Sequence, residues 1–367
     1  MYNALPQTYR ETPLEQLKER ISAARERHGE RLVILCHHYQ RLEVVAFGDY
    51  LGDSYLLAKT AQELTEAETI VFCGVHFMAE SADILAGPGQ TVFLPNPLAG
   101  CPMADMAEIP DVLAAWEELK DFGGAERITP LSYMNSAAAL KSFCGENGGL
   151  ICTSSNAEQT LAWAWGRREK VFFFPDRHLG YNTARQMGIR DEQTVLWDFS
   201  KPLGGLSAEE IERAKIILWK GHCHVHTNFT GDQVVQMREK YPGVKIVAHP
   251  ECPWEVVEKA DAVGSTNFIV DYCAKQPPGS IIAIGTEINL INRLAHTYPD
   301  KRIIELSGST CPVCANMYRT TLNDLAHCLE NYPDLKPIKV SERIKKNARV
   351  ALQRMIDVTS GAPVTGD

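Results

Sequence analysis

A pair of cysteines near the C-terminal end of the chain has the spacing of a chemically active motif. Cys311 and Cys314 are separated by two residues in the stretch GSTCPVCANM (308–317), where we expect a tight turn. The same spacing serves a zinc knuckle, a dithiol redox pair and a ligand to an iron–sulfur cluster, and it also occurs in cysteines that only pack. A local zinc knuckle needs two more ligands, and no cysteine or histidine lies within 10 residues of the pair. Partners that complete a metal site must therefore come from distant segments.

Several of the eleven cysteines have a simpler interpretation. The N-terminal segment has no apolar stretch of the kind found in secretory signals, so we expect a cytoplasmic protein with reduced thiols. Cys36 and Cys73 lie within or at the ends of apolar stretches typical of strands, and Cys273 and Cys328 lie in stretches typical of helices. Free cysteine behaves as a small hydrophobic residue, so we predict that these four are buried.

Composition and charge narrow the class of protein. The chain has 367 residues and a net charge of −9, from 37 basic and 46 acidic side chains. It has no basic tract, which argues against a nucleic-acid partner. No apolar run approaches the roughly 18–20 residues of a membrane span, which argues against a membrane protein. The length predicts two or three domains.

Short apolar segments alternate with helical patterns along the chain. Each segment is rich in β-branched residues, as a strand buried on both faces must be, and helices of about 10–15 residues separate the segments. This alternation predicts an α/β fold of three related α/β/α units with short parallel sheets. The expected strands are 31–39, 68–74, 90–95, 128–135, 149–156, 170–176, 214–226, 244–251, 260–267, 280–287 and 302–308.

The same patterns predict where the segments of the chain begin and end. A helix that starts near Pro13 should place Leu14, Leu17 and Ile21 on one stripe, and a second helical pattern covers 49–64. The expected organisation is an N-terminal helical extension (1–29), three α/β/α units (30–110, 111–226 and 227–330) and a C-terminal helical tail (331–367).

Polar residues gather where the predicted strands end, which in parallel sheets is where ligands bind. Three loops at matching places carry Cys101, Cys223 and the C-terminal cysteine pair. If the units face a common centre, one cysteine from each loop meets there, which suits a cluster assembled by the fold better than a local zinc site. The polar residues are His37, Tyr39, Tyr133, Asn135, Thr153 to Asn156, His249, Glu251, Ser265 and Thr266.

Twelve stretches between about residues 30 and 330 resemble the longer members of the quinolinate synthase family, iron–sulfur enzymes that make the pyridine ring of NAD. Any one stretch is a weak signal, but their shared order is specific. The fold of that family, three pseudo-symmetric α/β/α domains around the active site, agrees with the pattern above. The stretches are CHHYQ (36–40), GDSYLLA (52–58), GVHFMAESADIL (74–85), AGCPMADM (99–106), YMNSAAALK (133–141), CTSSNA (152–157), PDRHLGYN (175–182), KGHCHVH (220–226), AHPECP (248–253), ADAVGST (260–266), IGTE (284–287) and CPVCANM (311–317).

The resemblance implies a [4Fe–4S] cluster that is held by only three cysteines. Matched by motif, these are Cys101, Cys223 and Cys314. Cys314 is favoured over Cys311 because the family ligand is followed three residues later by a methionine, here Met317. Cys311 is then either spare or a redox partner of Cys314. Three ligands leave one iron open, and an open metal site can bind substrate and act as a Lewis acid.

The resemblance also implies the reaction. Iminoaspartate and dihydroxyacetone phosphate condense to quinolinate, with loss of phosphate and two waters, in the de novo synthesis of NAD. Whether an L-aspartate oxidase is a physical partner stays open. The rival interpretations are an aconitase-like iron–sulfur hydro-lyase and a non-catalytic iron–sulfur or zinc redox sensor. A sensor needs no proton-transfer residues at strand ends, and a simple hydro-lyase needs no sites for two substrates.

Residue roles follow from the same resemblance. Glu251 is expected to act near the open iron, while His37 and Tyr133 handle enol and imine protons. The implied catalytic residues are His37, Tyr39, Tyr133, His249 and Glu251. The implied substrate-binding residues are His37, Ser54, Tyr133, Asn135, Ser154, His249, Glu251, Ser265 and Thr266.

Taken one at a time, several of these residues have structural explanations. Ser54 could cap a helix, His249 could be a turn residue, and Tyr133 could be a core residue at a strand end. In GHCHVH, an extended strand would turn the two histidines beside Cys223 to the opposite face, which disfavours a zinc site there. A supporting role for His226 stays open.

Overall fold

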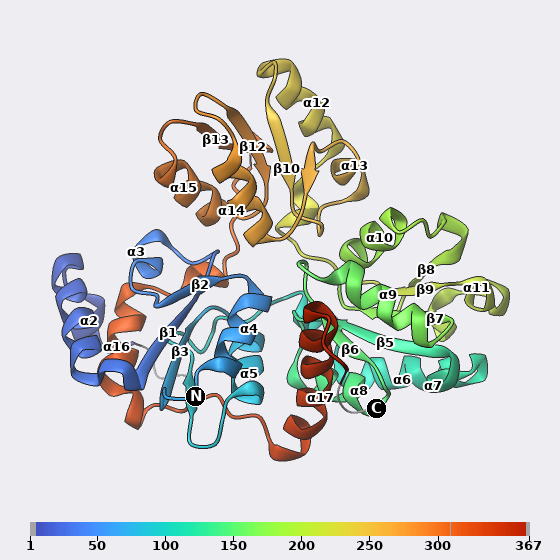
Figure 1. Ribbon diagram of the computed structural model, residues 1–367, viewed down its shortest axis with the longest axis horizontal. Coiled ribbons are helices and arrows are strands. Elements are labelled where there is room, and N and C mark those ends of the chain that lie inside the picture. Colours follow the sequence, from blue (N-terminus) through green and yellow to red (C-terminus); the bar gives the residue numbers. More distant parts are fainter. Residues whose placement is uncertain (1–4, 309, 365–367) are drawn as a thin grey trace. The chain divides into compact units, whose positions relative to one another are not determined.

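The computed structural model describes residues 5–308 and 310–364, and the chain divides into two compact units. The first unit comprises Met1–Cys101, Glu287–Arg293 and Val313–Val340, and the second comprises the remainder. Three short parallel sheets flanked by helices confirm the predicted α/β class (Figure 1). The boundaries of the five predicted segments, and the packing of the units around a common centre, stay predictions.

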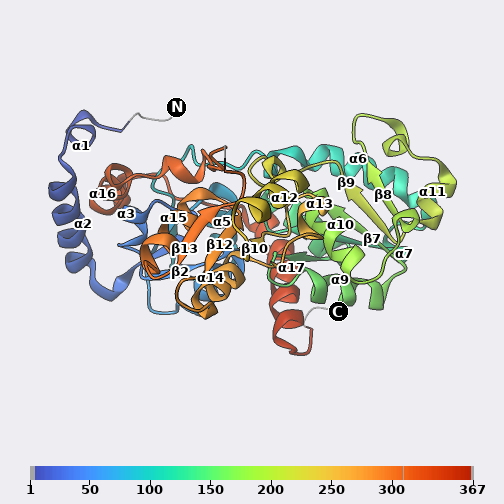
Figure 2. The same cartoon turned by 90° about the horizontal axis from the view of Figure 1, so that it is seen from above.

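The first unit contains one parallel sheet in the order β2-β1-β3-β4. Helices α2 and α16 lie side by side, and they pack with β1 and β3 in one hydrophobic core (Figures 1 and 2). The strands are β1 (Leu32–His37), β2 (Tyr50–Gly52), β3 (Thr69–Cys73) and β4 (Thr91–Phe93). The helices are α1 (Gln7–Arg10), α2 (Leu14–His28), α3 (Leu42–Val45), α4 (Ser54–Glu63), α5 (His76–Leu85), α16 (Leu322–Asn331) and the start of α15 (Ile288–Thr297).

The second unit contains two parallel sheets, in the orders β6-β5-β7-β9-β8 and β11-β10-β12-β13. The strands are β5 (Ile128–Tyr133), β6 (Leu150–Cys152), β7 (Lys170–Phe174), β8 (Thr194–Trp197), β9 (Ile216–Trp219), β10 (Lys245–Ala248), β11 (Ala262–Val263), β12 (Ile281–Gly285) and β13 (Arg302–Glu305). The helices are α6 (Ile109–Leu119), α7 (Gly124–Arg127), α8 (Ala138–Glu146), α9 (Ala157–Arg167), α10 (Arg177–Gln186), α11 (Ala208–Arg213), α12 (Gly231–Lys240), α13 (Trp254–Val257), α14 (Thr266–Lys275) and α17 (Glu342–Ser360).

The three sheets repeat one plan. In each sheet the first strand in sequence pairs with the second on one side and the third on the other. Two of the sheets also share a side-chain contact at the start of their first strands. The carboxylate of Asp49 accepts a hydrogen bond from the backbone N–H of Ile34 at 2.7 Å, and Asp261 accepts one from Ile246 at the same distance. The repeat inferred from pattern alone is therefore present in strand order and in local contacts.

Burial follows the predicted patterns. Strands β3, β5 and β7 are buried along their whole length, as the β-branched and aromatic composition of strands covered on both faces requires. The four cysteines predicted to be structural, Cys36, Cys73, Cys273 and Cys328, are fully buried, which confirms that prediction. Pro13 precedes the first residue of α2, also as predicted, but Leu14 is 51% exposed and only Leu17 and Ile21 enter the core.

Several predicted boundaries are wrong because polar strand ends were counted as strand. The largest error concerns 214–226, since β9 stops at Trp219 and the chain then turns into a 3₁₀ helix at His226–Asn228. The helical pattern over 49–64 begins with the short strand β2, and β8 was not predicted. Both are edge strands of three to four residues, which carry little periodic signal.

Helix α10 packs unusually close to the five-stranded sheet. A Cβ atom on Gly180 would lie 2.5 Å from a side-chain carbon of Leu218 and 2.7 Å from one of Phe173, so only glycine fits this contact. The close approach holds the start of α10 at the carboxyl ends of β7 and β9. Among the described residues, no helix combines the length and the apolar composition that a membrane crossing requires.

Candidate active site

The turn after β10 carries the carboxylate of Glu251. The strand ends at Ala248, and the backbone N–H of His249 still donates to the carbonyl of Gly285 on the neighbouring strand at 3.0 Å. The N–H of Cys252 then donates back to the carbonyl of His249 at 3.0 Å, which closes a tight turn. Glu251 is thereby directed into the protein, where it is 3% exposed.

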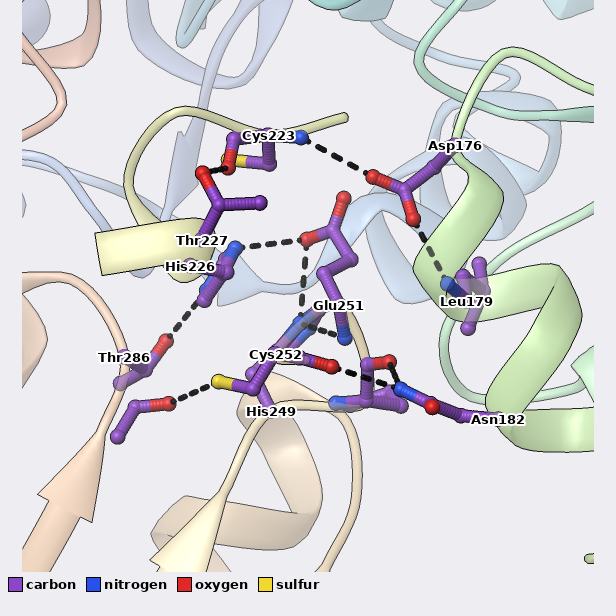
Figure 3. A network of polar contacts seen from close by, with 12 residues as sticks. Asp176, Leu179, Asn182, Cys223, His226, Thr227, His249, Glu251, Cys252 and Thr286 are labelled. Carbon is purple, nitrogen blue, oxygen red and sulfur yellow. Dashed lines mark hydrogen bonds and ion pairs between the residues drawn. The ribbon is translucent and has the colours of Figure 1, made fainter. Parts of the chain in front are cut away.

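Glu251 is held between two histidines. Its Oε2 atom lies 3.0 Å from Nδ1 of His226 and 3.1 Å from Nδ1 of His249, and the two imidazole rings stack with centroids 4.4 Å apart (Figure 3). Burial raises the pKa of Glu251, but the two histidines outweigh that effect and hold the pKa below its ordinary value. The other carboxylate oxygen, Oε1, is buried and has no hydrogen-bond partner among the described residues.

The imidazole of His226 has a second contact, on the side away from Glu251. Its Nε2 atom lies 3.1 Å from the hydroxyl of Thr286, directly after β12. On the other side of the ring, Nδ1 lies 3.0 Å from Oε2 of Glu251, so the imidazole lies between a hydroxyl and a carboxylate. A supporting role for His226, which the sequence left open, agrees with these two contacts and stays a prediction.

Cys223 lies beside this group. Its Sγ, a ring nitrogen of His226 and a carboxylate oxygen of Glu251 all lie within 4.8 Å of one another. The backbone N–H of Cys223 donates to Oδ2 of Asp176 at 3.1 Å, and its carbonyl accepts from the Thr227 hydroxyl at 2.9 Å. The turn that follows Trp219 produces this arrangement. In the extended segment expected from the sequence, His226 would lie further along the strand direction and away from Glu251.

Asp176 was not predicted as a site residue, although its motif PDRHLGYN was identified. It caps α10, since its Oδ1 accepts from the backbone N–H of Leu179 at 2.7 Å, and its side chain is fully buried. Burial and the charge of Glu251 raise the pKa of Asp176 well above its ordinary value. A strand-end aspartate followed by a helical pattern is a capping signal that the sequence did contain.

The other predicted site residues of the second unit also lie at strand ends. Tyr133 ends β5 and is 4% exposed, while the buried Oδ1 of Asn135 has no hydrogen-bond partner among the described residues. Ser154 is half-buried in the turn between β6 and α9. Ser265 caps α14 by accepting from the N–H of Phe268 at 3.3 Å, and Thr266 is the buried first residue of that helix.

The first unit places its predicted residues in the corresponding positions. His37 ends β1, its Nδ1 accepts from the backbone N–H of Tyr39 at 3.2 Å, and the two rings meet edge to face with centroids 4.8 Å apart. The suggestion that Ser54 caps a helix is wrong. Asp53 is the cap of α4, accepting from Leu56 N–H at 2.9 Å, and Ser54 is the half-buried first residue of the helix.

Cys101 and Cys314 both belong to the first unit and both are half-buried in loops. The backbone N–H of Cys314 donates to Oε1 of Glu287 at 3.3 Å, and Asn289 donates to the same carboxylate through its backbone and its side chain. Burial raises the pKa of Glu287 to about 8. Its motif, IGTE, is one of the twelve stretches above, but no role was predicted for Glu287.

Three cysteines have the accessibility that iron–sulfur ligands require. Iron–sulfur ligands are thiolates, which need some access to solvent or metal. Cys101, Cys223 and Cys314 are the half-buried cysteines, and Cys311 is exposed. Burial raises the thiol pKa of five cysteines, Cys144, Cys152, Cys252, Cys273 and Cys328. Contact with Cys36, together with burial, raises the thiol pKa of Cys73. These six thiols are therefore protonated and inert.

Three repeated parallel sheets flanked by helices, with ionisable side chains at their strand ends, define the class of the protein: an α/β enzyme. Comparison with known proteins identifies the family within this class. The model of the family described as quinolinate synthetase A protein matches residues 19–357, and the chain belongs to that family.

Individual relatives agree with the family match. A protein of Acidobacterium capsulatum named quinolinate synthase is 52% identical over 356 residues, which cover 95% of each chain. Proteins of the same name from Corynebacterium glutamicum and Geobacillus kaustophilus are 50% identical over 364 residues and 48% identical over 358 residues. The matches cover 98% and 96% of this chain, and 92% and 96% of the relatives.

Proposed function

We propose that this chain is a quinolinate synthase, a transferase of de novo NAD synthesis that acts in the cytoplasm. It would condense iminoaspartate with dihydroxyacetone phosphate and release quinolinate, phosphate and two waters. The atoms of the two substrates equal those of the products, so the overall reaction consumes neither an oxidant nor a reductant. The chemistry it requires is formation of one carbon–carbon bond, loss of phosphate by cleavage of its ester C–O bond, imine formation, proton transfer and dehydration.

A metal centre for this reaction therefore needs to polarise a substrate rather than to exchange electrons. We propose that Cys101, Cys223 and Cys314 hold a [4Fe–4S] cluster, which would supply Lewis acidity at an iron without a protein ligand. The half-burial of these three thiols, against the full burial of the protonated cysteines, supports this choice of ligands.

The observation that carries the proposal is the buried, half-satisfied carboxylate of Glu251. Both histidine contacts go to Oε2, while Oε1 is buried without a partner among the described residues. An unsatisfied carboxylate oxygen costs stability, so its presence beside the Cys223 thiol indicates function. Because the pKa of Glu251 is lowered, its carboxylate is ionised, and we propose that Oε1 accepts a substrate proton in the dehydration steps.

The remaining site residues match substrates that carry carboxylates and a phosphate. Thr266 and Ser54 are the first residues of ten-residue helices, where backbone N–H groups and the helix dipole favour anions. Together with Asn135, Ser154 and Ser265 they would bind the anionic groups without adding charge. His37, Tyr39, Tyr133 and His249 would transfer protons between the enol and imine intermediates.

Product analysis after anaerobic reconstitution with iron and sulfide tests the proposal. The protein should convert iminoaspartate and dihydroxyacetone phosphate to quinolinate, and omission of either substrate should abolish the product. Turnover of a single hydroxy acid to its dehydrated product, with no quinolinate, would identify a hydro-lyase instead. A full cluster with no turnover of either kind would favour the redox sensor.

A further inference from the structure

Asn182 holds the turn that carries Glu251. Its side chain lies in the second half of α10 and is fully buried. The Nδ2 group donates two hydrogen bonds, one to the carbonyl of Pro250 at 2.7 Å and one to the carbonyl of Cys252 at 2.8 Å (Figure 3). These two carbonyls belong to the residues immediately before and after Glu251. One amide group thus fixes the backbone on both sides of the carboxylate.

The third polar atom of Asn182 shows that packing alone does not explain this residue. Its Oδ1 is buried and has no hydrogen-bond partner among the described residues. A buried acceptor without a partner lowers stability, and an apolar residue of similar size would avoid that cost. What an apolar residue cannot supply is a pair of N–H donors aimed at two carbonyls. The two donors therefore account for an asparagine at this position.

The same helix also fixes the neighbouring cysteine. Asp176, the cap of α10, accepts the N–H of Cys223, and Asn182 lies six residues further along the helix. Gly180, between them, allows α10 to pack against the sheet too closely for any other residue. Helix α10 therefore connects the loop of Cys223 to the turn of Glu251 through hydrogen bonds at two points.

We propose that Asn182 is a positioning residue, which sets the placement of the Glu251 carboxylate relative to Cys223. The proposal deepens the proposed function and rests on it for its kinetic consequences, but its structural consequence is independent of catalysis. Without the two donors, the turn at 249–252 gains freedom, and Oε1 spends less time where it can accept a substrate proton. Misplacement of a catalytic group by about 1 Å can cost on the order of 10²-fold in rate.

Thr183→Val supplies a matched control for Asn182→Ala. Thr183 is buried on the same helix, but its hydroxyl donates only to the carbonyl of Leu179 within α10. Each variant removes one buried polar side chain from α10, and only Asn182→Ala removes the contact with the turn. If Asn182→Ala does not fold, Asn182→Ser retains one donor and should show a smaller effect in the same direction.

Hydrogen–deuterium exchange of the cluster-free protein tests the structural step. Peptides that cover 249–252 should exchange at least about threefold faster in Asn182→Ala than in the wild type, because the local opening free energy falls. The same peptides should be unchanged in Thr183→Val. Unchanged exchange at 249–252 in Asn182→Ala would overturn the proposal, whatever the enzyme catalyses.

A double-mutant cycle in the reconstituted protein tests whether Asn182 acts through Glu251. We expect Asn182→Ala to lower kcat about 10- to 100-fold with iron content intact and KM within about twofold. In the Glu251→Gln background the same substitution should lower kcat less than about twofold, because the group it positions is already lost. If the loss of kcat in the double variant equalled the product of the losses in the two single variants, the proposal would be overturned. Absence of quinolinate from the wild type would refute the proposed function and leave the exchange result to decide on Asn182.

Discussion

Oε2 of Glu251 lies 3.0 Å from Nδ1 of His226, and this contact makes the two oxygens of the carboxylate unequal. The oxygen that faces His226 also faces His249, so it is committed to orientation. The second oxygen is buried and unmatched among the described residues, and is therefore available for a proton or a ligand. A carboxylate that is fixed on one side and open on the other has the form of a general acid or base.

Glu251→Gln should separate cluster binding from turnover. The amide keeps the shape of the side chain but cannot accept a proton, so kcat should fall on the order of 10²–10⁴-fold. Iron content and binding of the first substrate should be retained, because the lost interaction is made only in the transition state. Rapid-quench product analysis should reveal an intermediate short of quinolinate. Near-normal quinolinate formation would show that the carboxylate is structural and would pass the proton role to His249 or Tyr133.

Single Cys→Ser substitutions should identify the cluster ligands. Protein purified anaerobically should carry about four iron and four sulfide per chain. Cys101→Ser, Cys223→Ser and Cys314→Ser should each abolish the cluster, measured by iron and sulfide content and by the visible absorbance. Cys311→Ser is the matched control and should retain it. The reverse result for the last two cysteines would invert their assignment.

His178 should make the folded state sensitive to acid. Its Nε2 accepts from Nε of Arg177 at 3.1 Å, and burial, with the charge of Arg177, lowers its pKa to about 4. Between pH 4 and its ordinary pKa of about 6.5, the unfolded chain binds the proton and the folded chain does not, so stability falls as the pH is lowered through this window.

His178→Gln tests this prediction, because glutamine keeps an acceptor for Arg177 but cannot be protonated. The difference in unfolding free energy, variant minus wild type, should rise by on the order of 1–2 kcal/mol when the pH is lowered from 7 to 4.5. The rise is limited because the ring is partly exposed and its charge is partly screened. Urea unfolding at both pH values measures the change. Titration of carboxylates is common to both proteins and cancels in the difference. A pH-independent difference would refute the prediction.

The repeated aspartates should contribute equally to stability. Asp49→Ala and Asp261→Ala each leave a buried backbone N–H, of Ile34 or Ile246, without its acceptor. Each substitution should cost about 1–3 kcal/mol in unfolding free energy, measured by urea titration. Asp271→Ala, at an exposed position on α14, serves as the control and should stay within about 0.5 kcal/mol of the wild type. A negligible cost for either repeated aspartate would show that the shared contact is incidental.

The alternation of apolar strands and helices predicted the α/β class, the parallel sheets and the burial of Cys36, Cys73, Cys273 and Cys328, because burial on both faces imposes a composition that the sequence displays. The motifs also identified the segments that carry Glu251 and Cys223, although the strands predicted there were too long. These are local properties, set by residue type and by neighbours within a few positions.

The tertiary structure decided which residues contact Glu251 and Cys223. His226 reaches Glu251 because the chain turns after Trp219, and Thr286, Asp176 and Asn182 reach the same site from β12 and α10. Such contacts join positions as far as 70 residues apart in the chain, as between Asn182 and Cys252. Local periodicity carries no information about them, since they depend on how α10 and the loop after β9 meet the turns after β10 and β12.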